Sequence, residues 1–203
     1  GGFYTTHPGN KQTQPATRDC WNEHMNLIEQ LSTLQPNMVH WRHEIHQYPE
    51  TAYEETRTAD LVARELEQMG LEVHRGLAET GVVGVLSAGR GNRAIGLRAD
   101  LDALNLQELN HFEHRSLHDG KMHACGHDGH TAMLLGAAKH LSTDPSFDGT
   151  VFFIFQPAEE GGHGAKRMMD EGLFDAFPCE SVFGMHNMPG FEAGTFAVRK
   201  GPL

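Results

Sequence analysis

The sequence His123-Ala124-Cys125-Gly126-His127-Asp128-Gly129-His130 decides how the rest of the chain is interpreted. This short stretch offers a thiol, three imidazoles and a carboxylate, and its two glycines let the backbone turn tightly. Cys125 and His127 are two positions apart, so on an extended segment their side chains leave the same face. A thiolate and a neutral imidazole on one face provide half the ligands of a first-row transition-metal site.

The apolar run that follows, residues 131–141, predicts a helix. Its apolar residues recur at helical spacing: Met133, Leu134, Ala137, Ala138 and Leu141. The cluster therefore lies in a loop that leads into a helix N-terminus, where backbone N–H groups favour anionic ligands. Taken singly, each Cys or His is better explained as a structural residue. Because they are crowded together, we favour a site whose remaining ligands come from elsewhere in the chain.

Length and composition set limits on the class of protein. The 203 residues suit one domain, or one and a part. The net charge of −11 excludes the basic footprint of a nucleic-acid binder, and 15 histidines favour metal binding. The three cysteines, Cys20, Cys125 and Cys179, do not form a disulfide framework. We therefore expect a reducing, cytoplasmic compartment.

Two kinds of segment are not expected from the sequence. No apolar run approaches membrane-spanning length, and no signal peptide opens the chain, so no membrane partner is expected. Residues 1–19 are poor in apolar side chains, and we interpret them as a flexible leader. Residues 20–203 form the folded part.

The remaining pattern mixes helices with short apolar strands. Helices are predicted over 25–34, from Pro36 to about residue 47, over 54–69 with Gly70 as cap, and over 165–171 with Gly172 as cap. Strands are predicted over 71–74, 82–87, 94–98, 150–155 and 181–185, with a turn at 89–92. This alternation predicts an α/β fold with a central, mostly parallel or mixed sheet flanked by helices.

Acidic residues follow the strand predicted over 94–98. Asp100 and Asp102 share one face, at the end of a strand where open α/β sheets place their ligand sites. They are metal ligands, or acceptors that orient a ligating histidine. The alternative is a turn with solvated acids.

Two later strands also end in polar residues. Glu159-Glu160 follows the strand over 150–155, and His186 follows the strand over 181–185. Adjacent carboxylates point in different directions, so one can hold a metal while the other faces the reacting water. That division serves metal-assisted hydrolysis. The alternative for the pair alone is two solvated acids in a glycine-rich loop.

The segment His43-Glu44-Ile45-His46 resembles a metalloprotease helix motif, but its two histidines are three apart instead of four. We do not interpret it as a primary metal site. His46 and the acids Glu50, Glu54 and Glu55 either line a cleft or form a solvated polar face.

Five motifs together resemble one family. They are His46-Gln47-Tyr48-Pro49-Glu50, Arg98-Ala99-Asp100-Leu101-Asp102-Ala103-Leu104, residues 123–132, Gln156-Pro157-Ala158-Glu159-Glu160-Gly161-Gly162 and Gly184-Met185-His186-Asn187. In this order they resemble the aminoacylase-type metallopeptidase family, peptidase M20. Within it they are most similar to the amidohydrolase branch of hippurate hydrolases and indoleacetyl-amino-acid hydrolases. The resemblance runs from about Trp21 to Leu203.

The resemblance implies a two-metal amidohydrolase that cleaves small N-acyl amino acids. By position, Cys125, His127, Glu160 and His186 correspond to metal ligands, and Glu159 corresponds to the general base. Supporting roles are implied for Asp100, Asp102, Asp128 and His130. The resemblance implies two divalent ions, manganese or zinc, with cobalt or nickel possible in place of either.

The chain also departs from the family pattern. The family's chains are longer, with an inserted lid domain that usually forms a homodimer and a later segment that supplies one more histidine ligand. Residues 20–203 would then be part of a metallohydrolase catalytic domain.

Two alternatives use the same residues differently. One is a metal-binding module without catalysis. The other is thiol catalysis, with Cys125 as nucleophile and His127 or His130 as base. The second leaves the paired glutamates without a role.

Overall fold

The computed structural model describes residues 27–201. The chain divides into two compact units, residues 1–33 and 34–203. In the first unit, residues 27–32 are helical. The leader predicted over residues 1–19 lies outside the described residues, and so does Cys20. Within the described part, no helix has the length and apolar character that crossing a membrane requires.

The second unit contains the helices and strands of the predicted α/β fold. The helices are α2 (Gln35–Gln47), α3 (Thr56–Gln68), α4 (His127–Thr143), α5 (Gly164–Asp170) and α6 (Leu173–Ala176). The strands are β1 (Glu72–Leu77), β2 (Gly81–Ala88), β3 (Ala94–Asp100), β4 (Gly149–Gln156) and β5 (Ser181–Gly184). Every predicted strand is present within a few residues. The sequence did not predict α6, and α4 begins at His127, inside the His/Cys cluster.

Among the described residues, the strands form one mixed sheet in the order β1-β2-β4-β3-β5. β1 pairs with β2 and β2 with β4 in antiparallel fashion, whereas β3 runs parallel to both β4 and β5. The connection at residues 89–93 therefore does not join neighbouring strands, because β4 lies between β2 and β3. This arrangement confirms a mixed sheet flanked by helices.

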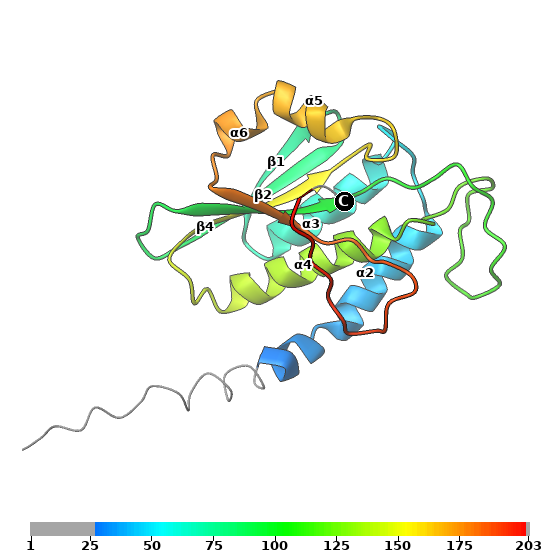
Figure 1. The fold of residues 1–203 in the computed structure, drawn as a ribbon, viewed down its shortest axis with the longest axis horizontal. Coiled ribbons are helices and arrows are strands. Elements are labelled where there is room, and N and C mark those ends of the chain that lie inside the picture. Colours follow the sequence, from blue (N-terminus) through cyan, green and yellow to red (C-terminus); the bar gives the residue numbers. More distant parts are fainter. Residues whose placement is uncertain (1–26, 202–203) are drawn as a thin grey trace, which may run out of the picture. The chain divides into compact units, whose positions relative to one another are not determined.

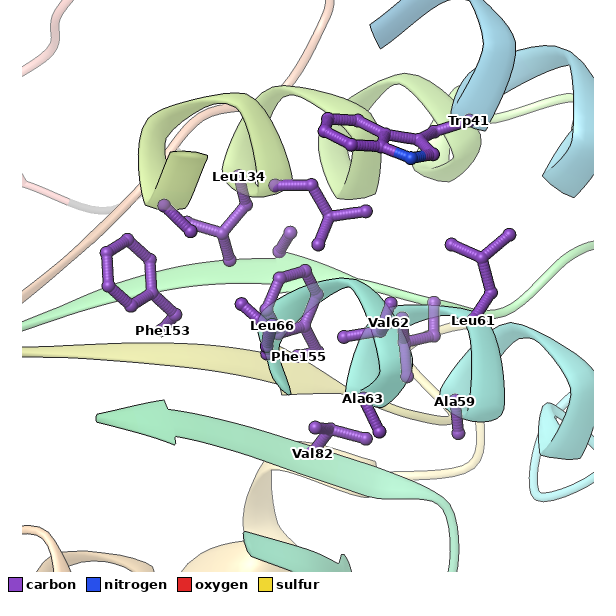
Figure 2. Packing of buried hydrophobic residues seen from close by; sticks show 14 of the residues in the cluster. Trp41, Ala59, Leu61, Val62, Ala63, Leu66, Val82, Leu134, Phe153 and Phe155 are labelled. Atoms are coloured by element: carbon purple, nitrogen blue, oxygen red, sulfur yellow. The ribbon is translucent and has the colours of Figure 1, made fainter. Parts of the chain in front are cut away.

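β4 is the central strand and is buried on both faces. Val151, Phe153 and Phe155 belong to a core cluster with residues of α2, α3 and α4, whereas Phe152 and Ile154 belong to a second cluster with residues of α5 and α6. This alternation is what the two-residue period of a strand dictates. Figure 1 shows the two helix layers on opposite faces of the sheet, and Figure 2 shows the packing of the larger cluster.

Local signals explain where the helices begin and end. Pro36 lies in the first turn of α2, and Gly70 and Gly172 have positive φ angles where the preceding helices end. The carboxylate of Glu50 accepts hydrogen bonds from the amides of Arg57 and Thr58 at 3.0 and 2.8 Å. Glu50 thus satisfies free amides of the first turn of α3.

We expect Phe153→Ala to lower the free energy of unfolding by ~3–5 kcal/mol, because it opens a cavity in the larger cluster. The matched control is Phe196→Ala, since the Phe196 side chain is 84% exposed, and this change should stay within ~0.5 kcal/mol of the parent. Urea denaturation at neutral pH measures both. Equal effects would contradict the placement of Phe153 in the core.

Candidate metal centre

The sequence-predicted site residues converge at one edge of the sheet. The parallel strands β3, β4 and β5 end there, and each is followed by candidate residues: Asp100 and Asp102, Glu159 and Glu160, and His186. The carboxyl ends of parallel strands are where open α/β sheets place ligands. His127, the first residue of α4, meets these groups, so candidate ligands from distant parts of the sequence come together.

Cys125, His127 and His186 form the first candidate ligand group. Their ligand atoms lie within 4.8 Å of one another, and Cys125 Sγ is 3.3 Å from His186 Nε2. The segment bends at Cys125 instead of being extended, and Gly126 has a φ of +89°. The positive φ favours glycine at position 126, and a Cβ there would also press on the side chain of Asn187.

His127 carries an unpartnered nitrogen at the centre of the cluster. Its Nδ1–H donates to the backbone oxygen of Asp102 at 2.8 Å, which leaves Nε2 as the nitrogen that faces the acids. Nε2 is buried and has no hydrogen-bond partner. It lies 3.7–3.9 Å from carboxylate oxygens of Asp100, Glu159 and Glu160.

These distances are longer than hydrogen bonds. Among the described residues, His127 forms one candidate ligand group with the two glutamates and another with Asp100 and His130. A cation bound by either group would satisfy the nitrogen and the carboxylates of that group. The donor set of thiol, imidazole and carboxylate is one that zinc and manganese accept. The residues therefore fit a metal centre. His127 therefore belongs both to the candidate ligand sets that contain carboxylates and to the set that contains Cys125 and His186.

The charges at this centre depend on one another. Burial opposes ionisation of Asp100, but the hydrogen bond from His130 and the charges of His127 and Arg98 together lower the pKa of Asp100 to about 2. Burial also opposes a charge on His127, whereas Asp102 and Asp100 raise the pKa of that imidazole. Asp100 is therefore ionised at neutral pH and attracts either a proton or a metal ion to Nε2 of His127.

His130 supports the site through hydrogen bonds at both ring nitrogens. Nδ1–H donates to Asp100 Oδ1 at 2.6 Å, and Nε2 accepts the backbone N–H of Asn187 at 3.0 Å. His130 thus joins the end of β3 to the segment that carries His186. The supporting roles that the resemblance implies for Asp100 and His130 remain predictions, and these contacts are of the kind that such roles require.

Asp102 holds the two glutamates by their backbone. Its two carboxylate oxygens accept the N–H groups of Glu159 and Glu160, each at 2.9 Å. Burial opposes its ionisation, but the interaction with His127 and these two hydrogen bonds lower the pKa of Asp102. The alternative, a turn in which Asp100 and Asp102 are solvated acids, is wrong, since both are buried.

The two glutamate side chains do not diverge as the sequence pattern predicts. Both approach Nε2 of His127, Glu159 at 3.9 Å and Glu160 at 3.8 Å. They differ in exposure, since the side chain of Glu159 is 41% exposed and that of Glu160 is 26% exposed. Glu159 therefore has the freer access to water.

The environment of Cys125 opposes a free thiolate. Burial first, and then the neighbouring Glu160, Glu159 and Asp100, raise the pKa of the Cys125 thiol to about 12. A nucleophilic cysteine needs the opposite, an electropositive surrounding that lowers its pKa. In this acidic surrounding Cys125 is a poor nucleophile, whereas a divalent cation bound beside it would supply positive charge and stabilise the thiolate as its ligand.

Asp128 faces away from this centre, toward α2. Its Oδ2 accepts hydrogen bonds from His46 Nδ1–H at 2.9 Å and from Arg42 Nε at 3.2 Å. His46 Nε2–H donates to Glu108 Oε1 at 3.1 Å. Burial opposes a charge on His46, but its hydrogen bonds to Asp128 and Glu108 raise the pKa of His46.

His46 therefore neither lines a cleft nor binds a metal, and the candidate ligand groups among residues 27–201 include neither His43 nor His46. The sequence analysis did not identify Glu108 or Arg42. Each lies far along the chain from its partner and outside any motif.

We expect His46→Gln to destabilise the fold by ~3 kcal/mol at pH 6, because it leaves the buried Glu108 without its cation and leaves Asp128 with Arg42 alone. The folded pKa of His46 is raised, so the stabilisation is complete below the unfolded value near 6.5 and is lost as pH rises through the folded pKa. The difference between parent and variant in urea denaturation should therefore shrink from pH 6 to pH 9. His111→Gln, at an exposed position, is the control. A difference that does not change with pH would contradict the charged state of His46.

Comparison with known proteins places these residues among hydrolases. The sequence profile of peptidase family M20/M25/M40 matches residues 96–201. The chain is 48% identical to a hippurate hydrolase of Campylobacter jejuni over 179 residues, which are 88% of this chain and 46% of that enzyme. It is 47% identical to the IAA-amino acid hydrolase ILR1-like 4 of Arabidopsis thaliana over 167 residues, which are 82% of this chain and 37% of that enzyme.

A solved structure shows the same fold. It is the Bacillus subtilis YXEP protein, described as a dinuclear metal-binding peptidase from the M20 family. The TM-score is 0.80 at 37% identity, over 85% of this chain and 48% of that one. The chain thus spans less than half the length of these relatives.

Proposed function

The chain belongs to peptidase family M20/M25/M40, and on this premise we propose that it is part of a metal-dependent amidohydrolase that cleaves N-acyl amino acids. One relative is named for hippurate, an N-acylated amino acid, and another for IAA-amino acid conjugates. The observation that carries the proposal is the buried, unpartnered Nε2 of His127, which faces carboxylate oxygens of Asp100, Glu159 and Glu160.

We assign Cys125, His127, Glu160 and His186 as ligands of two divalent ions. The group of Cys125, His127 and His186 and the group of His127 with the two glutamates support a pair of ions that share His127 as a neighbour. A thiolate ligand favours manganese, zinc, cobalt or nickel over magnesium, and manganese or zinc is the first expectation. When bound, the ions act as Lewis acids that activate water and polarise the amide carbonyl.

We assign Glu159 as the general base. Its carboxylate accepts a proton from the attacking water and delivers it to the nitrogen of the leaving amine, so the products are a carboxylic acid and a free amino acid. The greater exposure of its side chain supports this role over that of Glu160. Asp102 orients both glutamates through their amides and fixes the tautomer of His127.

The wider assignments follow from the same proposal. Residues 20–203 form part of a catalytic domain, and the partner is a small-molecule substrate. A cytoplasmic location remains a prediction from the sequence, and a homodimer is implied by the resemblance for the longer relatives only.

We expect Glu159→Gln to lower kcat for N-acyl amino acid hydrolysis by roughly 10²–10⁴-fold, because the amide cannot accept the proton of water. Bound metal should stay at the parent level. Glu67→Gln, an exposed change on α3, is the control and should keep parental kcat. Parental turnover in the Glu159 variant would reject this base.

We expect the purified chain to bind close to two divalent ions, as measured by elemental analysis after dialysis against zinc or manganese. Cys125→Ser should lose an ion, because it replaces a thiolate with a weak neutral ligand. Chelation should remove the ions reversibly. A folded chain that retains no metal would reject the assigned centre.

A second candidate function is metal binding without turnover. The candidate ligand groups support it as well, because binding an ion requires the ligands but not the base. Bound metal with no hydrolysis of any N-acyl amino acid in a substrate panel would support it.

A further inference from the structure

Glu55 is a fully buried carboxylate outside the proposed metal centre. It lies immediately before α3, and its side chain is 0% exposed. Oε1 accepts the backbone N–H of Ala158 at 2.8 Å, and Oε2 accepts the hydroxyl hydrogen of Thr80 at 2.7 Å. Among residues 27–201, no salt bridge neutralises it. A buried acid held only by neutral donors is costly, so its contacts require an explanation.

The contact with Ala158 holds an unusual backbone conformation. Ala158 has a φ of +52°, in the left-handed region that residues with a Cβ rarely adopt. Its carbonyl accepts the N–H of Gly164 at 3.0 Å, which closes the loop behind the glutamates. A Cβ at Gly164 would lie 1.7 Å from the oxygen of Pro157, so the loop is tightly closed.

Ala158 directly precedes the two glutamates. The three consecutive amides of Ala158, Glu159 and Glu160 are bound by two buried carboxylates, Glu55 on the first and Asp102 on the next two. If Ala158 relaxed to a negative φ, the following peptide would rotate and both glutamate side chains would change direction. The hydrogen bond to Glu55 fixes the peptide before the N–Cα bond of Ala158, and the bonds to Asp102 fix the peptides after it, so together they oppose that relaxation.

We propose that Glu55 is a positioning residue, which aims the Glu159 and Glu160 carboxylates at the metal centre by holding Ala158 in its left-handed conformation. The effect of Glu55 on a metal centre rests on the proposed function. The geometry of the loop rests only on the hydrogen bonds of Glu55. It assigns to the segment before α3 a role in the site, although this segment contributes no ligand.

The chain offers matched variants for the test. In Glu55→Gln, the amide oxygen still accepts from Ala158 and the amide N–H can donate to the Thr80 hydroxyl. Glu55→Met has similar length but no acceptor. Thr80→Val removes the other hydrogen bond of the same carboxylate and leaves the one to Ala158 in place.

The first measurement is hydrogen exchange at the amides of residues 158–160, followed by NMR in each folded variant. The second is the affinity for Zn²⁺ alone, from equilibrium dialysis. We expect Glu55→Met to speed exchange at these amides and to weaken Zn²⁺ binding by roughly 10–100-fold, the usual cost of losing support for a ligand. Glu55→Gln and Thr80→Val should keep parental exchange and affinity. If Glu55→Met does not fold, Glu55→Asp replaces it, because the shorter side chain withdraws from Ala158.

The outcomes separate the two proposals. Parental exchange at residues 158–160 in Glu55→Met would overturn the positioning role, and so would equal losses of affinity in Glu55→Met and Thr80→Val. Faster exchange with parental Zn²⁺ affinity would also overturn it. If the parent chain binds no Zn²⁺, the proposed function fails, and the exchange comparison between Glu55→Met and Thr80→Val still decides whether Glu55 holds the loop.

Discussion

The hydrogen bonds that Asp102 accepts from the amides of Glu159 and Glu160 are the constraint on which the candidate centre depends. They join the end of β3 to the end of β4, and the backbone oxygen of Asp102 also receives Nδ1–H of His127. One residue therefore fixes where the paired acids lie and which nitrogen of the imidazole faces them. Because Asp102 is buried, its charge has to be satisfied by these donors, and the three segments cannot separate without leaving it unpaired.

The same arrangement concentrates negative charge around one imidazole. Carboxylates from β3 and from the loop after β4 approach Nε2 of His127, and the thiol of Cys125 lies beside them. Like charges this close repel one another, and burial strengthens the repulsion. A bound cation would replace that repulsion with attraction, so metal binding and stability are expected to be linked in this chain. The site is thus better described as a set of groups that a cation completes than as a set of independent ligands.

Much of the site was predictable because it depends on local rules. The polar ends of the strands pointed to the right edge of the sheet, since the carboxyl ends of parallel strands meet there. The spacing of Cys125 and His127 was a weaker guide, because it assumed an extended segment and the chain bends at Cys125. The supports were not predictable in the same way. Glu55 and Ala158 are 103 residues apart, and His46 and Glu108 are 62 apart. No periodicity marks such pairs, because each is created by the packing of loops. The position of β4 between β2 and β3 was not predictable from the sequence either. The apolar pattern of a strand indicates that the strand is buried, but not which strand it pairs with.

The strand order has a consequence for how the chain reaches this structure during synthesis. β1 and β2 can pair as soon as both leave the ribosome, but β3 has neighbours only in β4 and β5, which come later in the chain. Until residues 149–156 emerge, β3 has no strand beside it, and the inner edge of β2 is open. The nascent chain therefore exposes apolar strand edges for a long interval, which is when aggregation competes with folding and chaperones act. The ligands from the early and the late parts of the chain meet only at the end of that interval.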